Sequence, residues 1–261
     1  MSMIINPYIF GAGSVTPPSG SIPTNNLRVW LESTDNVTYG STTPFNVTAW
    51  HHVQSLGTNN AVTSSGRNPN YVATGPTFVN KPYLQFNQPQ EDIMSIPYNG
   101  NLDFSANGFT IYLVGSIATW NTLSFYLAHT NDAVLTQGWG FFYINNKLRF
   151  FINNWNNVDN YMEINANALN QRALFKFTWN KSVMTCSYRQ LGNTVANSKA
   201  FAGPYTNPSG YPLTIMSLPG GTASINDTSG DIAALVIYNG VLSAVDEAQV
   251  ETYLRSKYNI S

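Results

Sequence analysis

The stretch GDIAALVIYNGVLSAVDEAQVETYL, residues 230–254, decides the fold of this chain. From Ile232 to Tyr238 every side chain is apolar, so both faces of an extended strand here must be covered by protein. Asn239 and Gly240 follow directly, and both residue types end strands and form turns. The pattern predicts a fully buried strand that stops at residue 239.

The second half of this stretch predicts a helix. Ser243 is a preferred N-cap residue, and Asp246 three positions later completes a variant of the capping box. Apolar side chains recur at helical spacing in one stripe: Val250, Tyr253, Leu254 and Tyr258. We expect the stripe to pack onto the sandwich, where the helix would shield an edge or an open end.

The rest of the body alternates strand and turn signals at short spacing, which is typical of an all-β domain. Residues 138–152 predict a hairpin around Asn145 and Asn146, since asparagine accepts the positive φ of a tight turn. Residues 173–190 repeat the form around Asn180 and Lys181. Further strands are expected at 108–117 and 212–218.

The chain begins with an apolar segment, MSMIINPYIF, and a linker rich in glycine, proline and serine. We expect 1–26 to form an arm and linker, and 27–261 to form the folded body. The arm could fold back as an edge strand, or it could anchor the protein in a neighbour through Ile4, Ile5, Pro7, Tyr8 and Phe10. A disordered tail is the third alternative. Neither a signal peptide nor a membrane span is expected.

Charged residues make up 10% of the chain, against about 25% in ordinary globular domains. Twelve basic residues nearly balance thirteen acidic ones, and no basic run occurs. This balance argues against nucleic-acid binding, which needs a positive surface. The single cysteine, Cys186, excludes an internal disulfide framework and is expected to be a small buried side chain.

Several motifs occur in the order found in one family. They are VWLES (29–33), AWHHVQSLGTNNAV (49–62), KPYLQFN (81–87) and the segment from Gly230 to Ile260. Together they resemble the concanavalin A-like, laminin-G-like jelly-roll domains, especially single-domain versions in phage and giant-virus structural proteins. The resemblance implies a two-sheet antiparallel jelly-roll sandwich with one C-terminal helix. Glu32, His52 and Asn87 stand where that family usually has aspartate, which weakens any expectation of a metal.

Some members of this wider fold are glycoside hydrolases, whose retaining chemistry needs two carboxylates about 5–5.5 Å apart. On one face of a strand such a pair would stand at i and i+2. None of the thirteen acidic residues has that spacing on an expected strand. The histidines show no metal-binding spacing. Calcium, which the resemblance implies as an occasional companion, would find oxygen ligands in Asp132 and Asp227; no other cofactor is expected.

The segment NNWNNVDNY, residues 153–161, is the candidate carbohydrate site. Aromatic rings can stack on sugar C–H faces, while amides and carboxylates bond to hydroxyls. The rings would be Trp155 and Tyr161, and the polar groups would come from Asn154, Asn156, Asn157 and Asp159. The alternative is an amide-rich turn with Trp155 packed against the sheet. Trp120 is a second candidate ring.

These observations favour a non-enzymatic virion surface protein: a capsid decoration, head fibre or tail adhesion module. Its arm would bind a capsid or tail protein and its sandwich would display a lectin-like surface, in multiple copies. Assembly in the host cytoplasm and residence on the virion surface would follow. The alternatives are a free carbohydrate-binding module and a glycoside hydrolase of the same fold.

Overall fold

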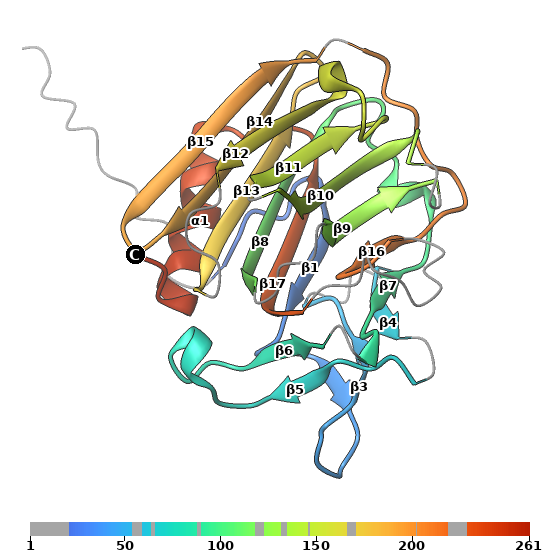
Figure 1. Ribbon diagram of the computed structural model, residues 1–261. Helices are drawn as coiled ribbons and strands as arrows, with labels where there is room; N and C mark the ends of the chain where they lie inside the picture. The colour runs from blue at the N-terminus through green and yellow to red at the C-terminus, as the bar shows by residue number, and fades with distance from the viewer. Residues whose placement is uncertain are drawn as a thin grey trace, which may run out of the picture.

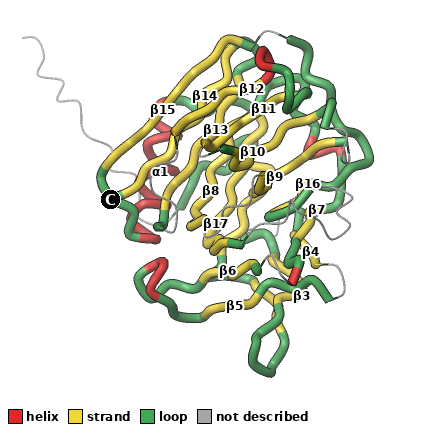
Figure 2. Tube along the Cα trace, viewed as in Figure 1, coloured by secondary structure: helices red, strands yellow, loops and turns green. Residues whose placement is uncertain are grey.

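The computed structural model describes residues 21–53, 59–63, 66–87, 90–117, 123–131, 135–145, 147–165, 171–201, 203–218 and 229–261. In this part of the chain nearly all regular structure is β, arranged as two antiparallel sheets with one α-helix near the C-terminal end (Figures 1 and 2). The fold is a β-sandwich of jelly-roll type, as the sequence predicts.

Eight strands form sheet A. In spatial order they are β15 (Asn193–Ala200), β14 (Val183–Gln190), β13 (Ala173–Trp179), β8 (Phe109–Ile117), β17 (Gly230–Asn239), β6 (Tyr83–Phe86) and β5 (Asn70–Val72), with β1 (Leu27–Glu32) also paired to β17. β17 therefore lies inside the sheet, where its first residues pair with β6 and its later ones with β1.

Nine strands form sheet B. In order they are β12 (Tyr161–Asn165), β11 (Lys147–Ile152), β10 (Gly138–Ile144), β9 (Leu123–Thr130), β16 (Leu213–Ile215), β7 (Met94–Ile96), β4 (Ala61–Thr63), β3 (Val47–Trp50) and β2 (Val37–Tyr39). β10 and β11 form the predicted hairpin, in which Ile144 pairs with Lys147 and Asn145 takes a φ of 50°.

The core lies between the two sheets and follows from strand alternation. On β8, Phe109, Ile111 and Leu113 face the core, while Tyr112 and Val114 face outward. The expectation that Cys186 is a buried side chain is confirmed. Four tryptophans are also buried, three of them in this core and Trp30 in the layer under the C-terminal helix: Trp30, Trp50, Trp139 and Trp179.

Helix α1 (Ala244–Tyr258) covers the outer face of sheet A, behind the strands in Figure 1. Val250, Leu254 and Tyr258 are fully buried against outward side chains of the central strands, including Val236 and Tyr112. The expected stripe is confirmed, but the expectation that it shields an edge or open end is wrong. A buried strand with two apolar faces requires cover on its second face, and α1 supplies it.

The N-terminal end of α1 forms as the sequence predicts. The Ser243 hydroxyl accepts a hydrogen bond from the Asp246 amide, and Asn259 ends the helix at a φ of 50°. Residues just before β1 also contact this layer: Ile22 is buried in the same cluster, and Gln249 donates to the Ser21 carbonyl at 3.1 Å. The chain therefore enters the body beside α1.

Candidate functional site

The predicted carbohydrate segment connects β11 to β12 at the outer end of sheet B. Asn154 accepts a hydrogen bond from the Asn156 amide at 3.1 Å, and Asn157 accepts one from the Asp159 amide at 3.0 Å. Two of the four polar side chains named for sugar binding therefore hold the turn itself. Asn156 and Asp159 are exposed.

Trp155 lies against the sheet rather than projecting from it. Its ring is half-buried and meets Phe142 edge-on, with centroids 5.9 Å apart and an interplanar angle of 71°. Phe142 in turn stacks on Phe125 at 4.8 Å, and both are fully buried. These rings form a small apolar cluster on the outer face of sheet B, so the placement of Trp155 is the one expected for a structural turn.

Tyr161, at the start of β12, is held by a cation. The guanidinium of Arg149 lies over its ring, 3.6 Å from the centroid, and also donates to Glu163 through Nε at 3.0 Å and Nη2 at 2.6 Å. Phe142, Arg149 and Glu163 are paired across β10, β11 and β12, which places them side by side. The register of these three strands therefore brings Phe142, Arg149 and Glu163 together.

Glu163 is shared by two cations. Lys147 donates to its second oxygen at 2.8 Å, opposite the bonds from Arg149. Burial alone would raise the pKa of Glu163, but the hydrogen bonds and charges of Lys147 and Arg149 outweigh it and hold that pKa below its ordinary value. The carboxylate is therefore ionised at neutral pH.

β12 and β15 are edge strands of different sheets that meet along a seam. Three side chains of sheet A bond to carbonyls of β12: Lys199 to Tyr161 at 3.2 Å, Asn197 to Glu163 at 3.0 Å and Tyr188 to Asn165 at 3.1 Å. An edge strand otherwise leaves such carbonyls without a protein partner. Side chains, rather than a backbone ladder, close this side of the sandwich.

A polar hollow of about 350 Å³ opens at this seam. Its lining combines one aromatic ring, one carboxylate, two ammonium groups and two amides with small groups: Lys147, Val158, Tyr161, Met162, Glu163, Asn165, Asn197, Ser198 and Lys199. Of the residues predicted for carbohydrate binding, Tyr161 lines this hollow. Asn154, Trp155, Asn156 and Asp159 do not.

The fold of this chain is similar to the folds of solved toxin structures and of a sialidase. The binding domain of a Paraclostridial mosquitocidal protein matches with a TM-score of 0.57 and 15% identity over 87% of this chain and 54% of that one. A sialidase from Trypanosoma rangeli, solved with sialic acid, matches with a TM-score of 0.59. The identity is 16% over 91% of this chain and 34% of that one.

A structure of botulinum neurotoxin type C, whose cell entry is described as dependent upon interaction with two ganglioside molecules, matches with a TM-score of 0.56. The identity is 15% over 88% of this chain and 51% of that one. The chain thus spans about half or less of these proteins. No protein-family model matches the sequence, and no curated protein matches it. Identities this low establish the jelly-roll architecture and nothing finer, so the resemblance to viral versions stays a prediction.

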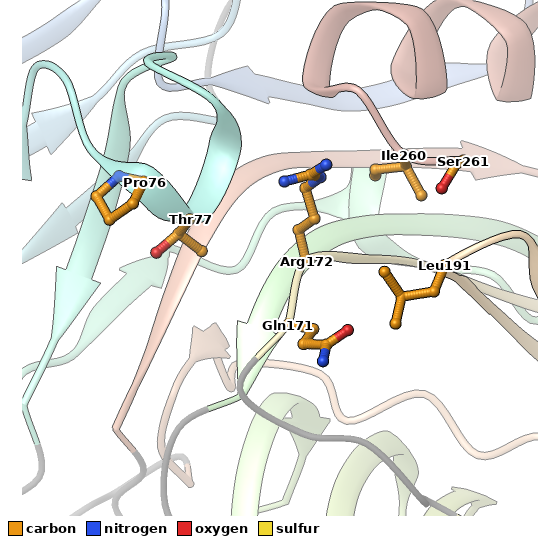
Figure 3. Close-up of a pocket in the computed structure, with 7 residues that line it drawn as sticks. All are labelled: Pro76, Thr77, Gln171, Arg172, Leu191, Ile260 and Ser261. Carbon is orange, nitrogen blue, oxygen red and sulfur yellow. The ribbon is translucent and has the colours of Figure 1, made fainter.

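A larger hollow, about 450 Å³, lies between the β14–β15 turn and the end of α1 (Figure 3). Figure 3 shows Arg172 and Gln171 between Pro76 and Thr77 on one side and Leu191 on the other. The Arg172 Nε donates to the Asn259 carbonyl at 2.7 Å, which ties it to the helix end. Its lining brings one amide side chain, Gln171, and one cation, Arg172, whereas the seam hollow brings two amides, a carboxylate and two ammonium groups. The seam hollow therefore offers a sugar more hydrogen-bonding groups.

A third hollow, about 220 Å³, contains one carboxylate, Asp92, with Pro44, Asn46, Gly66, Asn68 and Gln90. Asp92 is buried and accepts a hydrogen bond from the Asn87 amide at 2.8 Å. Burial raises the pKa of Asp92 to about 6, although the bonds from Asn87 act to lower it. Asn87, which stands where aspartate is usual in the jelly-roll family that the sequence resembles, thus donates a hydrogen bond to the nearby carboxylate of Asp92.

Several predicted residues lie outside the described part of the chain: Ile4, Ile5, Pro7, Tyr8 and Phe10 of the arm, Trp120, and the calcium candidates Asp132 and Asp227. Among the residues that are described, no group of three histidine, cysteine or acidic side chains could hold a metal. No described helix is long and apolar enough to cross a membrane.

Proposed function

We propose that this chain is a non-enzymatic glycan-binding sandwich displayed on a virion surface, with its N-terminal arm bound to a capsid or tail protein. The observation that carries the glycan part is the seam hollow between β11, β12 and β15. Its volume of about 350 Å³ falls within the range of small-ligand sites.

The chemistry of the hollow suits sugar hydroxyls. Asn165 and Asn197 bring amide groups, Glu163 brings an ionised acceptor, and Lys147 brings a donor. The Asn165 side chain is exposed and lines the hollow, where its amide can donate to and accept from a ligand. The groups are fixed by the β11–β12 register and by bonds across the seam, which lowers the entropy lost on binding.

Carboxylate placement supports binding over hydrolysis. The two polar hollows contain one carboxylate each, Glu163 and Asp92. Two pairs of described acids share a lysine: Glu247 and Glu251 on Lys176, and Glu32 and Asp35 on Lys257. A retaining glycosidase needs two carboxyl groups facing one sugar. The binding domains of toxins that have a similar fold are consistent with a receptor-binding role.

The place where residues 21–23 join the body supports display. Ser21 and Ile22 contact the α1 layer on the outer face of sheet A, and Tyr238 donates to the Pro23 carbonyl at 2.9 Å. The hollow lies at the β12–β15 seam instead. An arm that leaves beside α1 could bind another protein while the hollow stays open to solvent.

A glycan array probed with the full chain tests the binding proposal. Asn165→Ala should weaken any binding about tenfold, because an amide bonded to a ligand contributes roughly 1–1.5 kcal/mol. Asn101→Ala, which removes an exposed amide from the 3₁₀ turn Gly100–Leu102, is the matched control. Trp155→Ala tests the segment 153–161 that the sequence predicts as the carbohydrate site. If this variant binds as tightly as the parent, Trp155 does not contact the glycan. Binding of no glycan contradicts the proposal.

Deletion of residues 1–20 tests the anchor, because it keeps the contacts of Ile22 and Pro23 with the body. Incorporation of the protein into particles should be lost while glycan binding is kept. Unchanged incorporation would contradict the anchor and favour a free carbohydrate-binding module.

A further inference from the structure

The seam hollow carries more positive than negative side chains. Lys147 and Lys199 line it, and Arg149 contacts its single carboxylate, Glu163. Asp159 in the preceding turn is exposed and does not line the hollow. Across the whole chain acids slightly outnumber bases, 13 to 12, so this excess of cations is a local feature.

Lys199 has bonding capacity to spare. Its ammonium donates to the carbonyls of Val158 and Tyr161. An ammonium has three N–H donors, so one remains for a ligand. Within the part of the chain that is described, Lys199 forms no salt bridge, and its partners are these two carbonyls and the Tyr161 ring. Lys147, whose side chain is 45% exposed, bonds to Glu163 and to no other described residue, which leaves two further donors.

The aromatic ring of the hollow is already occupied by cations. The Arg149 guanidinium covers Tyr161 at 3.6 Å, and the Lys199 ammonium lies 5.8 Å from the same ring centre. A neutral sugar relies on stacking against an open ring face, and the Arg149 guanidinium, held by Glu163, covers one of the two faces of Tyr161. Recognition in this hollow therefore depends on charge and hydrogen bonds more than on stacking.

We infer that the hollow selects a glycan whose sugar carries a negative charge, as a carboxylate or a sulfate. This inference rests on the proposed glycan-binding function and narrows its ligand class. Lys199 and Lys147 bond to the anion, and the Asn165 amide bonds to a neighbouring hydroxyl. Charge-assisted bonds of this kind are shorter and stronger than neutral ones.

Matched glycan pairs test the inference on the full-length protein. Each acidic glycan is presented beside the same glycan without its acid: sialylated and desialylated lactose, glucuronic acid and glucose, sulfated and unsulfated galactose. The acidic member of at least one pair should bind about tenfold more tightly. Added salt should reduce this difference, because screening weakens exposed charge pairs. The carboxylate and sulfate pairs distinguish the two sources of charge.

Lysine variants locate the effect. Lys199→Gln and Lys147→Gln should each weaken binding of the acidic glycan about tenfold. Lys81→Gln removes the same charge from an exposed position outside the hollow and should change nothing. Lys199 also ties β15 to β12, so its loss could affect folding. Lys147→Gln, together with a melting curve for each variant, keeps the test valid.

The outcomes separate the two proposals. Equal binding of acidic and neutral members overturns the charge selection and leaves glycan binding intact. Binding of neither member on any pair overturns glycan binding and the selection with it. An equal loss in Lys81→Gln would show attraction by overall charge and would also overturn the assignment to the hollow.

Discussion

The guanidinium carbon of Arg149 lies 3.6 Å from the centre of the Tyr161 ring. The same side chain donates twice to Glu163 and once, at 3.2 Å, to the Trp155 carbonyl. One residue of β11 thus fixes the start of β12, its carboxylate and the turn between the strands. The shape of the seam hollow depends on this residue, although Arg149 itself does not line it.

Arg149→Gln should lower the free energy of unfolding by about 2–4 kcal/mol, because it leaves a partly buried carboxylate with fewer partners. Urea denaturation measures the change. Lys147→Gln removes the other cation on Glu163, but its side chain is 45% exposed and the pair should contribute about 0–1 kcal/mol. Equal losses in the two variants would contradict the central role of Arg149.

Lys257→Met should destabilise the attachment of α1 by about 3 kcal/mol. Glu32 on β1 is fully buried, and its Oε2 accepts hydrogen bonds from Lys257 and from the Tyr253 hydroxyl. Without Lys257 the buried carboxylate keeps only a neutral donor. The double variant Glu32→Gln, Lys257→Met should recover part of the loss in urea denaturation. A double variant less stable than Lys257→Met would contradict this account.

The architecture could be predicted because its main signals are local. The run from Ile232 to Tyr238 marks a strand covered on both faces, and the cap at Ser243 with the stripe that ends at Tyr258 marks the helix. The surface on which the helix packs could not be predicted from the sequence, because an apolar stripe does not indicate which surface it contacts. That depends on the outward side chains of strands such as β8.

The seam hollow could not be predicted because it joins distant segments. β15 lies at the edge of sheet A and is mostly exposed, so it lacks the apolar alternation that marks a strand. Lys199 and Glu163 are brought together by the closure of two sheets. One signal was available: Arg149 interrupts the apolar run Leu148–Ile152, and a charged residue there indicates a partner across the strands.

Gly140→Ala should destabilise the outer face of sheet B by about 1–3 kcal/mol. A Cβ at Gly140 would overlap the ring of Phe151, which lies over it from β11. Phe151 belongs to the cluster that supports Trp155, so near-UV circular dichroism should change together with the melting temperature. Gly40→Ala, where a Cβ would meet no atom within 4 Å, is the control and should melt like the parent.

Acid should weaken the fold through His129. This residue of β9 is fully buried, stacked on Tyr98 with centroids 6.1 Å apart, and burial lowers its pKa to about 4, although the Tyr211 backbone and Asp103 act to raise it.

The unfolded chain binds a proton at His129 below about pH 6.5, whereas the folded chain does so only near pH 4. Stability from the neutral ring is therefore complete above pH 6.5 and is lost as the pH falls to about 4, by roughly 3 kcal/mol. Asp92, whose pKa is raised to about 6, acts in the opposite direction over part of that window, because its protonated form is favoured in the fold. Urea denaturation at several pH values should show a shallower acid loss in His129→Leu than in the parent. If the acid slopes of His129→Leu and the parent coincide, the buried imidazole is not the group that titrates.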